Sequence, residues 1–525
     1  MIFPTVQFAG FFVVVLCLSW ALMPRPRLWK PFILVASYVF YGYADWRFVC
    51  LLAGSTVLNQ GAAVLMHRTA SPVNRTRLLT GAVALNLGLL GVFKYLDFFE
   101  GSVERMLGAL HLQAPVPLLE VALPIGISFF TFQAISYVAD VHAGRIRPAT
   151  AIDYAIYEAF FPHLIAGPIV RAREFIPQLA SPRDRSSVAT GPALFLILGG
   201  LFKKVVLADL LATRLVDPVF DAPRAHSGQE ALAAIYGYAV QIYCDFSAYT
   251  DMAIGLALLL GFRFPQNFDR PYTAASLQDF WRRWHMTLSR WLRDYLYIPL
   301  GGSRDGRWRT YRNIMITMLL GGLWHGANWT FVVWGGLHGA GLVVERWARD
   351  REERGTSASL AGDGTPRGSG ERVLVGAGAA PVAAGVLLAA RRTRPRGLRH
   401  RVRDLDPNAD LDAPGPGRAL RGFLTFQFVC LAWVFFRSRS VPAALELLGR
   451  LPHPGPSPLI TLPVLAAMAA GFATQVVPTE FWTGIQERFS ALPLLAQGAA
   501  LGCSVVVVTS LVADQGVAPF LYFRF

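Results

Sequence analysis

Charged residues are scarce in this chain, at 16% of 525 residues, whereas a soluble protein carries about 25%. Hydrophobic residues make up 54% of the chain. Apolar runs recur along most of its length, and many approach the roughly 20 residues that a helix needs to cross a bilayer. The composition therefore excludes an ordinary soluble domain and predicts an all-α, polytopic membrane protein.

Several chemical signatures are also missing. The five cysteines show no metal-ligand or disulfide spacing, so we expect no metal site and no bound cofactor. The sequence has neither a P-loop, which argues against ATP-driven transport, nor a Gly-x-Ser-x-Gly elbow. The net charge of +15 comes almost entirely from arginine, since the chain has only four lysines. Without a nucleic-acid-binding motif, this charge fits cytoplasmic loops better than a nucleic-acid partner.

The apolar runs predict roughly ten or eleven crossings, with re-entrant and interfacial helices between them. Basic residues follow the first, third and fifth runs, which places the N-terminus outside and the loop at 98–117 on the external face. Residues 151–170 contain two prolines and a glycine, so we expect them to re-enter rather than cross. The runs lie near residues 6–23, 31–45, 48–66, 79–97, 118–139, 190–212, 229–262 (long enough for two helices), 313–345, 421–437, 458–477 and 492–512.

One segment interrupts this pattern and divides the chain into three parts. Residues 348–420 are rich in Arg, Gly and Pro, and we interpret them as a largely disordered insert. A membrane core at 1–347 precedes the insert, and C-terminal transmembrane helices at 421–525 follow it. The Ala/Gly/Val-rich stretch at 373–390 leaves open a further crossing.

His325 is the first candidate for chemistry, because it lies in a charge-free run, 313–344, that is long enough to form one span. A titratable side chain at such depth is costly, and even a neutral imidazole needs hydrogen-bond partners there. Its unperturbed pKa of about 6.5 suits a general base that takes a proton from an attacking hydroxyl. Donors for the resulting oxyanion are expected from Asn328, the backbone near Gly326, or His285. The alternative is a histidine that only packs.

His285 is the second candidate. Residues 280–295 show helical spacing of aromatic and apolar positions with arginines elsewhere, which predicts one continuous amphipathic helix at the membrane interface. His285 would point into protein or lipid on its apolar side. The alternative is an ordinary core histidine. We expect His338, which follows in the next glycine-rich block, to pack or to form an interhelical hydrogen bond.

Two acids lie inside the run at 229–262. Asp245 and Asp251 either pair with arginines across the bundle, such as Arg282, Arg283 or Arg293, or form with Ser247 a polar wall of a reaction chamber. Ser128 and Gln133, on a further apolar segment, are candidates for the same polar lining.

Together these segments resemble the membrane-bound O-acyltransferase family, especially its alginate O-acetyltransferase and D-alanyl-teichoic-acid transfer branch. The resemblance rests on PIGISFFTFQAISYVADVHAG, FFPHLIAGPIVRAREF, YCDFSAYTDMAIG, NFDRPYTAASLQDFWRRWHMTLSRWLRDYLYIPLGG, GGLWHGANWTFVVWGGLHG and AWVFFRSRS. It implies a helical fold around a central tunnel in the bacterial cell membrane. It also implies that His325 is catalytic between Trp324 and Gly326, and that His285 is the second family position.

The resemblance further implies an acyl thioester donor from the cytoplasm, most simply acetyl-CoA, and an extracytoplasmic partner protein that passes the acyl group to a polysaccharide or wall polymer. Two readings remain beside this one, a transporter or export channel for a polysaccharide or acyl carrier, and a scaffold with an inactive site. Four arginines after the interfacial segment (Arg304, Arg307, Arg309 and Arg312) either bind the CoA phosphates or are ordinary cytoplasmic charge. The acceptor, acyl length and oligomeric state stay open.

Overall fold

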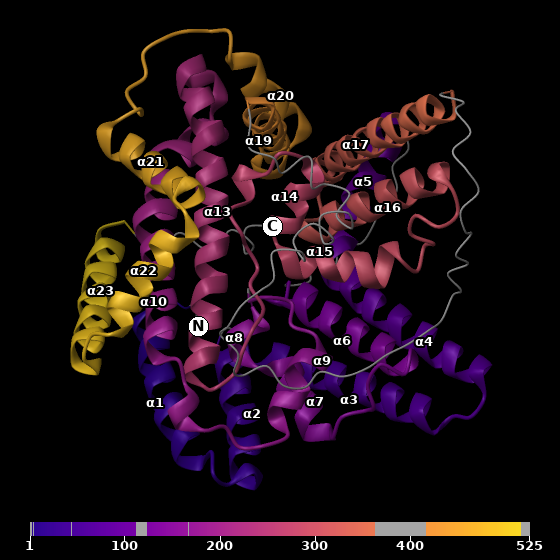
Figure 1. Cartoon of the computed structure of the whole chain (residues 1–525), viewed down its shortest axis with the longest axis vertical. Coiled ribbons are helices and arrows are strands. Elements are labelled where there is room, and N and C mark those ends of the chain that lie inside the picture. The colour runs from indigo at the N-terminus through magenta and orange to yellow at the C-terminus, as the bar shows by residue number, and fades with distance from the viewer. Residues whose placement is uncertain are drawn as a thin grey trace.

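A computed structural model describes residues 3, 5–43, 45–111, 123–165, 167–362 and 416–515 (Figure 1). Every regular element in these residues is a helix, as the composition predicts. Several helices are short or interrupted by π-helical turns, and these interruptions position the candidate site.

The N-terminal part of the chain packs helices around a buried aromatic core. Its elements are α1 (Val6–Leu22), α2 (Pro26–Gly42), α3 (Arg47–Arg68), α4 (Pro72–Leu90), the π-helical turn η1 (Gly91–Tyr95), α5 (Leu96–Ala109), α6 (Ile127–His142), α7 (Ala151–Ala159) and α8 (Phe161–Leu164). Helix α6 packs against α3 and α4 and is buried almost throughout. Gly126 precedes it with φ of +81°, and its missing side chain lets the backbone of Leu164 approach. Pro162 in α8 and Pro168 just after it are buried and interrupt the helix. Such an interruption inside the protein is compatible with a segment that re-enters.

Helix α13 (Gly228–Leu259) has 32 residues, is buried along most of its length and runs through the molecule (Figure 1). It is one helix, although the run at 229–262 is long enough for two. The segment packed along it is broken instead into α10 (Thr190–Leu201), the π-helix η4 (Phe202–Ala208), α11 (Asp209–Leu211), the π-helix η5 (Ala212–Val216) and α12 (Asp217–Asp221).

The segment that carries both candidate histidines forms a compact group of helices (Figure 1). It contains α14 (Leu277–Arg283), α15 (Met286–Leu292), the π-helix η8 (Arg293–Tyr297), α16 (Arg307–His325) and α17 (Trp329–Gly362). Helices α16 and α17 pack along each other as a hairpin, and α19 (Pro416–Arg437) packs against α17.

The remaining helices are α20 (Val441–Arg450), α21 (Leu462–Val476), α22 (Thr479–Ser490) and α23 (Leu494–Gln515). Helix α21 and helix α22 meet at a bend of 99°. The predicted insert at 348–420 begins inside α17, which continues to Gly362. The rest of the insert up to residue 415, including the stretch at 373–390, lies outside the described residues.

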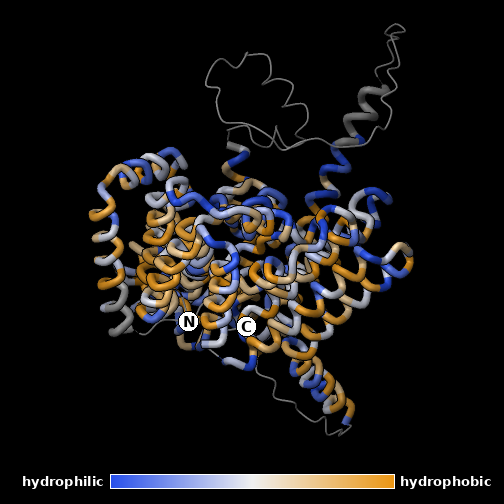
Figure 2. Tube along the Cα trace, turned by 90° about the horizontal axis from the view of Figure 1, so that it is seen from below, coloured by the Kyte–Doolittle hydropathy of each residue, from blue (hydrophilic) through white to orange (hydrophobic). Residues whose placement is uncertain are grey.

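Within the described residues, three helical segments are long and apolar enough to cross a membrane, and the bent pair makes a fourth if it is one span. The three are residues 47–68, 72–109 and 417–437. The chain is a multi-pass membrane protein, and apolar residues cover much of its helical body while hydrophilic ones gather at the upper rim in Figure 2. The number of ten or eleven crossings stays a prediction, because breaks divide other apolar runs, such as 190–212 and 313–345, into shorter helices.

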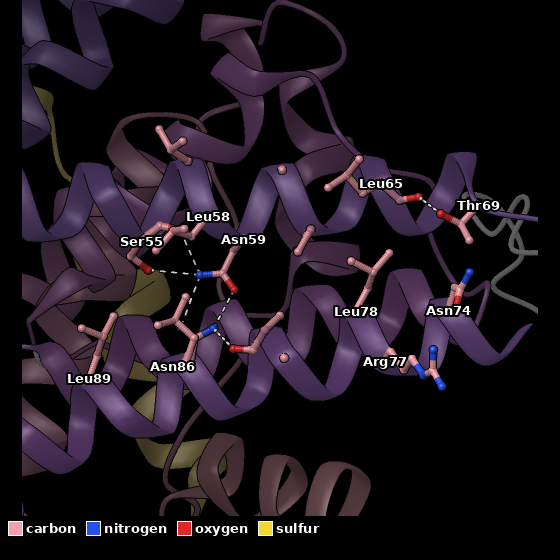
Figure 3. A pocket seen from close by; sticks show the side chains of 16 residues that line it. Ser55, Leu58, Asn59, Leu65, Thr69, Asn74, Arg77, Leu78, Asn86 and Leu89 are labelled. Carbon is pink, nitrogen blue, oxygen red and sulfur yellow. Dashed lines mark hydrogen bonds between the residues drawn. The ribbon is translucent and has the colours of Figure 1, made fainter. Parts of the chain in front are cut away.

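A groove of about 720 Å³ lies between α3 and α4 (Figure 3). Asn59 and Asn86 face each other on its floor and exchange hydrogen bonds, and Ser55 accepts a further one from Asn59. All residues that line it belong to these two helices and the turn between them. The groove is therefore separate from the segments that carry His285 and His325.

Candidate functional site

The run at 313–344 was expected to form one span. It is instead a helical hairpin that turns directly after His325. Helix α16 ends at this residue, and Gly326 is extended. Asn328 starts α17, since its side-chain oxygen accepts a hydrogen bond from the Thr330 backbone at 3.0 Å. A β-carbon on Gly326 would overlap the ring of Phe331. The hydropathy of the run conceals this turn because neither Gly326 nor Asn328 adds charge.

His325 is buried at the end of α16, with 3% of its surface exposed. Its ring lies edge-on to three aromatic rings: Trp324, Trp334 and Phe436, with centroids 5.0, 5.1 and 5.2 Å away. These rings come from α16, α17 and α19. The imidazole is thus fixed by elements more than 100 residues apart in sequence and held away from bulk water.

His285 is fully buried, but the predicted continuous helix over 280–295 is wrong. Helix α14 ends at Arg283 and α15 begins at Met286, with His285 between them at φ of +42°. A non-glycine residue in this left-handed region is strained unless its surroundings hold it there. The Phe246 ring lies edge-on at 4.7 Å and supplies part of that restraint. The break turns His285 out of the helical pattern and into the protein.

Asn267 orients the imidazole of His285. The Asn267 Oδ1 atom accepts from His285 Nδ1 at 3.1 Å and from Thr287 at its backbone nitrogen (3.1 Å) and hydroxyl (2.9 Å). Because a backbone N–H donates to this atom, it is the amide oxygen, so Nδ1 of His285 carries a proton. Nε2 of a neutral His285 is then an acceptor, and it has no hydrogen-bond partner within the described residues. His285 therefore serves as an oxyanion donor only when protonated.

The structure brings the two histidines to the same indole. Trp324 lies 6.0 Å from the His285 ring and 5.0 Å from the His325 ring, measured between centroids. Trp324 also packs on Phe132 of α6 at 5.3 Å. Sequence segments 40 residues apart thus meet around one buried side chain, as expected for two residues of one site.

An arginine-lined cavity of about 540 Å³ lies on one side of the hairpin. Arg290 and Arg282 line it, and no carboxylate pairs with either of them in the part of the chain that the structure describes. The remaining lining arginines are Arg293, Arg346 and Arg349, and α16 contributes Thr310, Ile314, Thr317 and Met318. The cavity therefore follows α16 from its first turns toward its middle. Arg304, Arg307, Arg309 and Arg312 do not line it.

A second cavity of about 690 Å³ lies at the opposite end of the hairpin, at the turn after His325. It is lined by Ala327, Asn328 and Trp329 from the turn, by residues of η1 and α5, and by residues 439–442 before and at the start of α20. Lys94 lines it and also donates a hydrogen bond to the His325 carbonyl at 3.2 Å. The second cavity thus reaches the end of α16, whereas the first follows α16 only as far as Met318, and neither His285 nor His325 is among the lining residues of either cavity.

The acids inside α13 pair with lysines, so the expected arginine partners are wrong. Lys204 bridges Asp245 and Asp209 at 2.8 and 2.7 Å, while Lys203 contacts Asp251 at 2.6 Å and Ser247 at 2.8 Å. The chain has only four lysines, and η4 supplies these two. The ion pairs account for the burial of the acids, and the predicted chamber-wall role stays a prediction.

The other predicted lining residues lie on α6. Ser128 accepts a hydrogen bond from Lys94 at 3.3 Å, and Gln133 is buried with no hydrogen-bond partner for its amide within the described residues. Asn328 donates to the Arg439 carbonyl at 2.9 Å. His338 is buried among aromatic rings and makes no hydrogen bond in the same part of the chain, so the structure shows packing and not the interhelical hydrogen bond. No three His, Cys, Asp or Glu side chains gather as a metal site in the residues described.

Two residues of the site escaped the sequence analysis. Asn267 stands at the start of the motif that contains His285, but 18 residues before it, and only the fold shows that they touch. Lys94 lies near the end of the apolar run 79–97, and residues 79–93 before it carry no charge. That isolation was the available signal, since an intramembrane charge usually marks a partner or a functional site.

The chain belongs to the membrane-bound O-acyltransferase family, whose pattern matches residues 126–351 and so includes both His285 and His325. The family assignment is supported over most of the chain by the peptidoglycan O-acetyltransferase of Helicobacter pylori. That protein is 35% identical over 477 residues, which cover 85% of this chain and 77% of the relative. The family predicted from the sequence motifs is thereby confirmed.

Further relatives share the membrane core. The probable alginate O-acetylase AlgI of Pseudomonas aeruginosa is 46% identical over 322 residues, 60% of each chain. A teichoic acid D-alanyltransferase of Streptococcus thermophilus is 30% identical over 241 residues, 43% of this chain and 58% of the relative. The match thus spans about three fifths of the alginate O-acetylase relatives.

Proposed function

We propose that this chain is a membrane O-acyltransferase. It moves an acyl group, most simply acetyl, from a cytoplasmic thioester such as acetyl-CoA to a hydroxyl of an extracytoplasmic polysaccharide or wall polymer, directly or through a partner protein. The observation that carries the proposal is the buried His325 at the end of α16, with one cavity along that helix and another at the turn after it. The relatives, by name, act on peptidoglycan and alginate hydroxyls.

In the proposed reaction, the hydroxyl oxygen attacks the thioester carbonyl carbon while the imidazole of His325 takes the hydroxyl proton. The tetrahedral oxyanion then collapses, the carbon–sulfur bond breaks, and the thiolate of CoA takes the proton back from the imidazolium. The products are an ester and free CoA. Burial among three aromatic rings keeps water from competing as the nucleophile.

We assign the acyl donor, acetyl-CoA or a similar thioester, to the arginine-lined cavity. Of its five arginines, Arg293 and Arg346 pair with Asp294 and Asp350, whereas Arg282 and Arg290 pair with no carboxylate of the described residues. Guanidinium groups bind phosphate oxygens in a bidentate manner. Arg290 is the strongest candidate, because it is half-buried and lies five residues after His285. Arg309 pairs with Asp305 at 3.4 Å outside this cavity, which favours the plain cytoplasmic-charge interpretation for the arginines at 304–312.

The acceptor is assigned to the second cavity. Trp329 is 53% exposed and packs on Phe98, while Asn328, Asp97 and Arg105 add polar groups beside these rings. Aromatic faces next to hydrogen-bonding groups suit a sugar or a hydroxyl-bearing loop of a partner protein. A central tunnel would form if the two cavities joined past His325 when substrates bind.

The test is release of free CoA from acetyl-CoA by the purified protein in detergent, with and without a hydroxyl acceptor such as an oligosaccharide of the host cell surface. We expect acceptor-dependent release that is lost in His325→Ala at unchanged protein level. His338→Phe is the matched control, since it removes another buried imidazole of the same hairpin that makes no hydrogen bond.

A transporter would release no CoA, and full activity in His325→Ala would refute the catalytic assignment. Mass spectrometry of surface glycans from cells with and without the protein identifies the acceptor. A scaffold with an inactive site would leave acetylation intact in a variant without both His285 and His325.

A further inference from the structure

Lys94 is a cation placed at the end of the helix that presents His325. Its Nζ atom donates to the carbonyl oxygens of Trp324 at 2.6 Å and His325 at 3.2 Å. The neighbouring Tyr95 hydroxyl donates to the Leu323 carbonyl at 2.7 Å. Three successive carbonyls at the end of α16 therefore receive their hydrogen bonds from η1, more than 225 residues earlier in the chain.

The end of a helix needs such partners, because its last four carbonyls receive no hydrogen bond from an N–H of the same helix. These carbonyls carry the negative end of the helix dipole, so a cation is favoured there. Water normally satisfies exposed helix ends, but α16 ends in the protein interior beside a buried histidine. Lys94 and Tyr95 replace that water with fixed groups.

The local backbone explains how two adjacent side chains reach the same helix end. Residues 91–95 form a π-helical turn between α4 and α5, and a π turn inserts one residue into the helical ladder and so re-aims the side chains there. Lys94 also donates to Ser128 of α6 at 3.3 Å, so it joins three elements at one point.

The ammonium group has three N–H donors, and its three contacts are the Trp324 carbonyl, the His325 carbonyl and the Ser128 hydroxyl. No donor is left for a reacting oxygen. We propose that Lys94 is a positioning residue for His325: it fixes the end of α16 and the extended turn at Gly326, and thereby sets the direction of the imidazole. The inference rests on the proposed acyl-transfer function, in which His325 is the base.

The experiment compares Lys94→Met, Lys94→Arg and Tyr95→Phe in the CoA-release assay, with kcat and the KM for acetyl-CoA measured separately. Lys94→Met removes the cation at similar length, and we expect kcat to fall about 10- to 100-fold, the loss typical of a catalytic group displaced by about 1 Å. The KM for acetyl-CoA should stay within about twofold, since the donor cavity lies elsewhere. Lys94→Arg should recover much of kcat, and Tyr95→Phe should cost less than Lys94→Met because it removes one hydrogen bond.

The matched control is Lys30→Met with Asp153→Asn, which removes another lysine and its paired charge, between α2 and α7. It should leave kcat near that of the unmodified protein. Wild-type kcat in Lys94→Met would overturn the inference, as would a loss in Lys94→Arg equal to that in Lys94→Met. If Lys94→Met does not fold, the arginine and Tyr95→Phe variants still decide, because a positioning role predicts graded kcat losses at constant KM. His325→Ala runs in parallel: its full activity would refute the proposed function itself, whereas an inactive His325→Ala beside a fully active Lys94→Met refutes only the role of Lys94.

Discussion

Replacing Asn267 by leucine tests whether the loop that carries His285 is held by a single oxygen atom. Leucine has a similar size but offers no acceptor. The substitution removes the partner of the His285 Nδ1 proton and of both donors on Thr287. Asn267 is 1% exposed, so water does not replace the lost oxygen without rearrangement.

The expected loss of stability follows from the hydrogen-bond donors that Asn267→Leu leaves without an acceptor. The Thr287 hydroxyl can rotate to another acceptor, but its backbone N–H cannot, and one buried unsatisfied donor costs about 1–3 kcal/mol. The imidazole loses the acceptor that fixes its proton on Nδ1, so the tautomer with the proton on Nε2, which also has no acceptor within the described residues, becomes populated. That change of tautomer abolishes the Nε2 acceptor, so we expect kcat to fall at least about tenfold in addition to the loss of stability. A wrong tautomer costs about 10⁴ in the Ser-His-Asp enzymes, which sets an upper bound.

The assay combines thermal unfolding in detergent, followed by tryptophan fluorescence, with acceptor-dependent CoA release. Asn267→Leu should unfold a few degrees below the unmodified protein and lose activity. Asn267→Asp is the control, because a carboxylate oxygen accepts the same hydrogen bonds, and it should retain most of both properties. An Asn267→Leu protein with unchanged unfolding and unchanged kcat would refute the assignment of the His285 tautomer.

Three further outcomes are expected. Lys204→Met should destabilise the protein by about 3–5 kcal/mol in thermal or denaturant unfolding, because Asp245 and Asp209 lose the buried cation that they share. A Lys204→Met protein of unchanged stability would contradict this. Gly326→Ala should lower kcat at least about tenfold, since the new methyl group overlaps Phe331, whereas Gly336→Ala, whose nearest neighbour is 3.7 Å away, should not. Arg290→Gln should raise the KM for acetyl-CoA about 10-fold or more with little change in kcat, the effect of one lost charged hydrogen bond. Equal KM values would remove the donor from this cavity.

The sequence was sufficient for the fold class, the family and the burial of the two candidate histidines, because each depends on local information. Low charge and recurring apolar runs predict membrane helices from composition alone. His325 and His285 stand in motifs whose glycines, tryptophans and arginines can be recognised without a structure. Burial of both side chains followed from the same patterns.

The breaks in the helices and their partners were not predictable in the same way. Residues 280–295 keep helical spacing throughout, yet the chain breaks at His285 because Asn267 and Phe246 hold it in a left-handed conformation. The arginine partners expected for Asp245 were wrong because lysines in a π-helical segment lie closer in space. Hydrophobic periodicity describes one helix at a time, and it does not show which distant residue hydrogen-bonds to the end of that helix.

The site is built at the places where helices stop, and this connects its chemistry with its fold. A helix end in an apolar interior exposes carbonyl or amide groups that must find partners. Here, Lys94 and Tyr95 donate hydrogen bonds to the carbonyls at the end of α16, and Asn267 accepts one from the backbone at the start of α15. Each histidine lies directly at such an end, where the backbone leaves the helical pattern. The residues that satisfy the helix ends therefore also aim the imidazoles, so mutations at those partners should reduce turnover before they abolish folding.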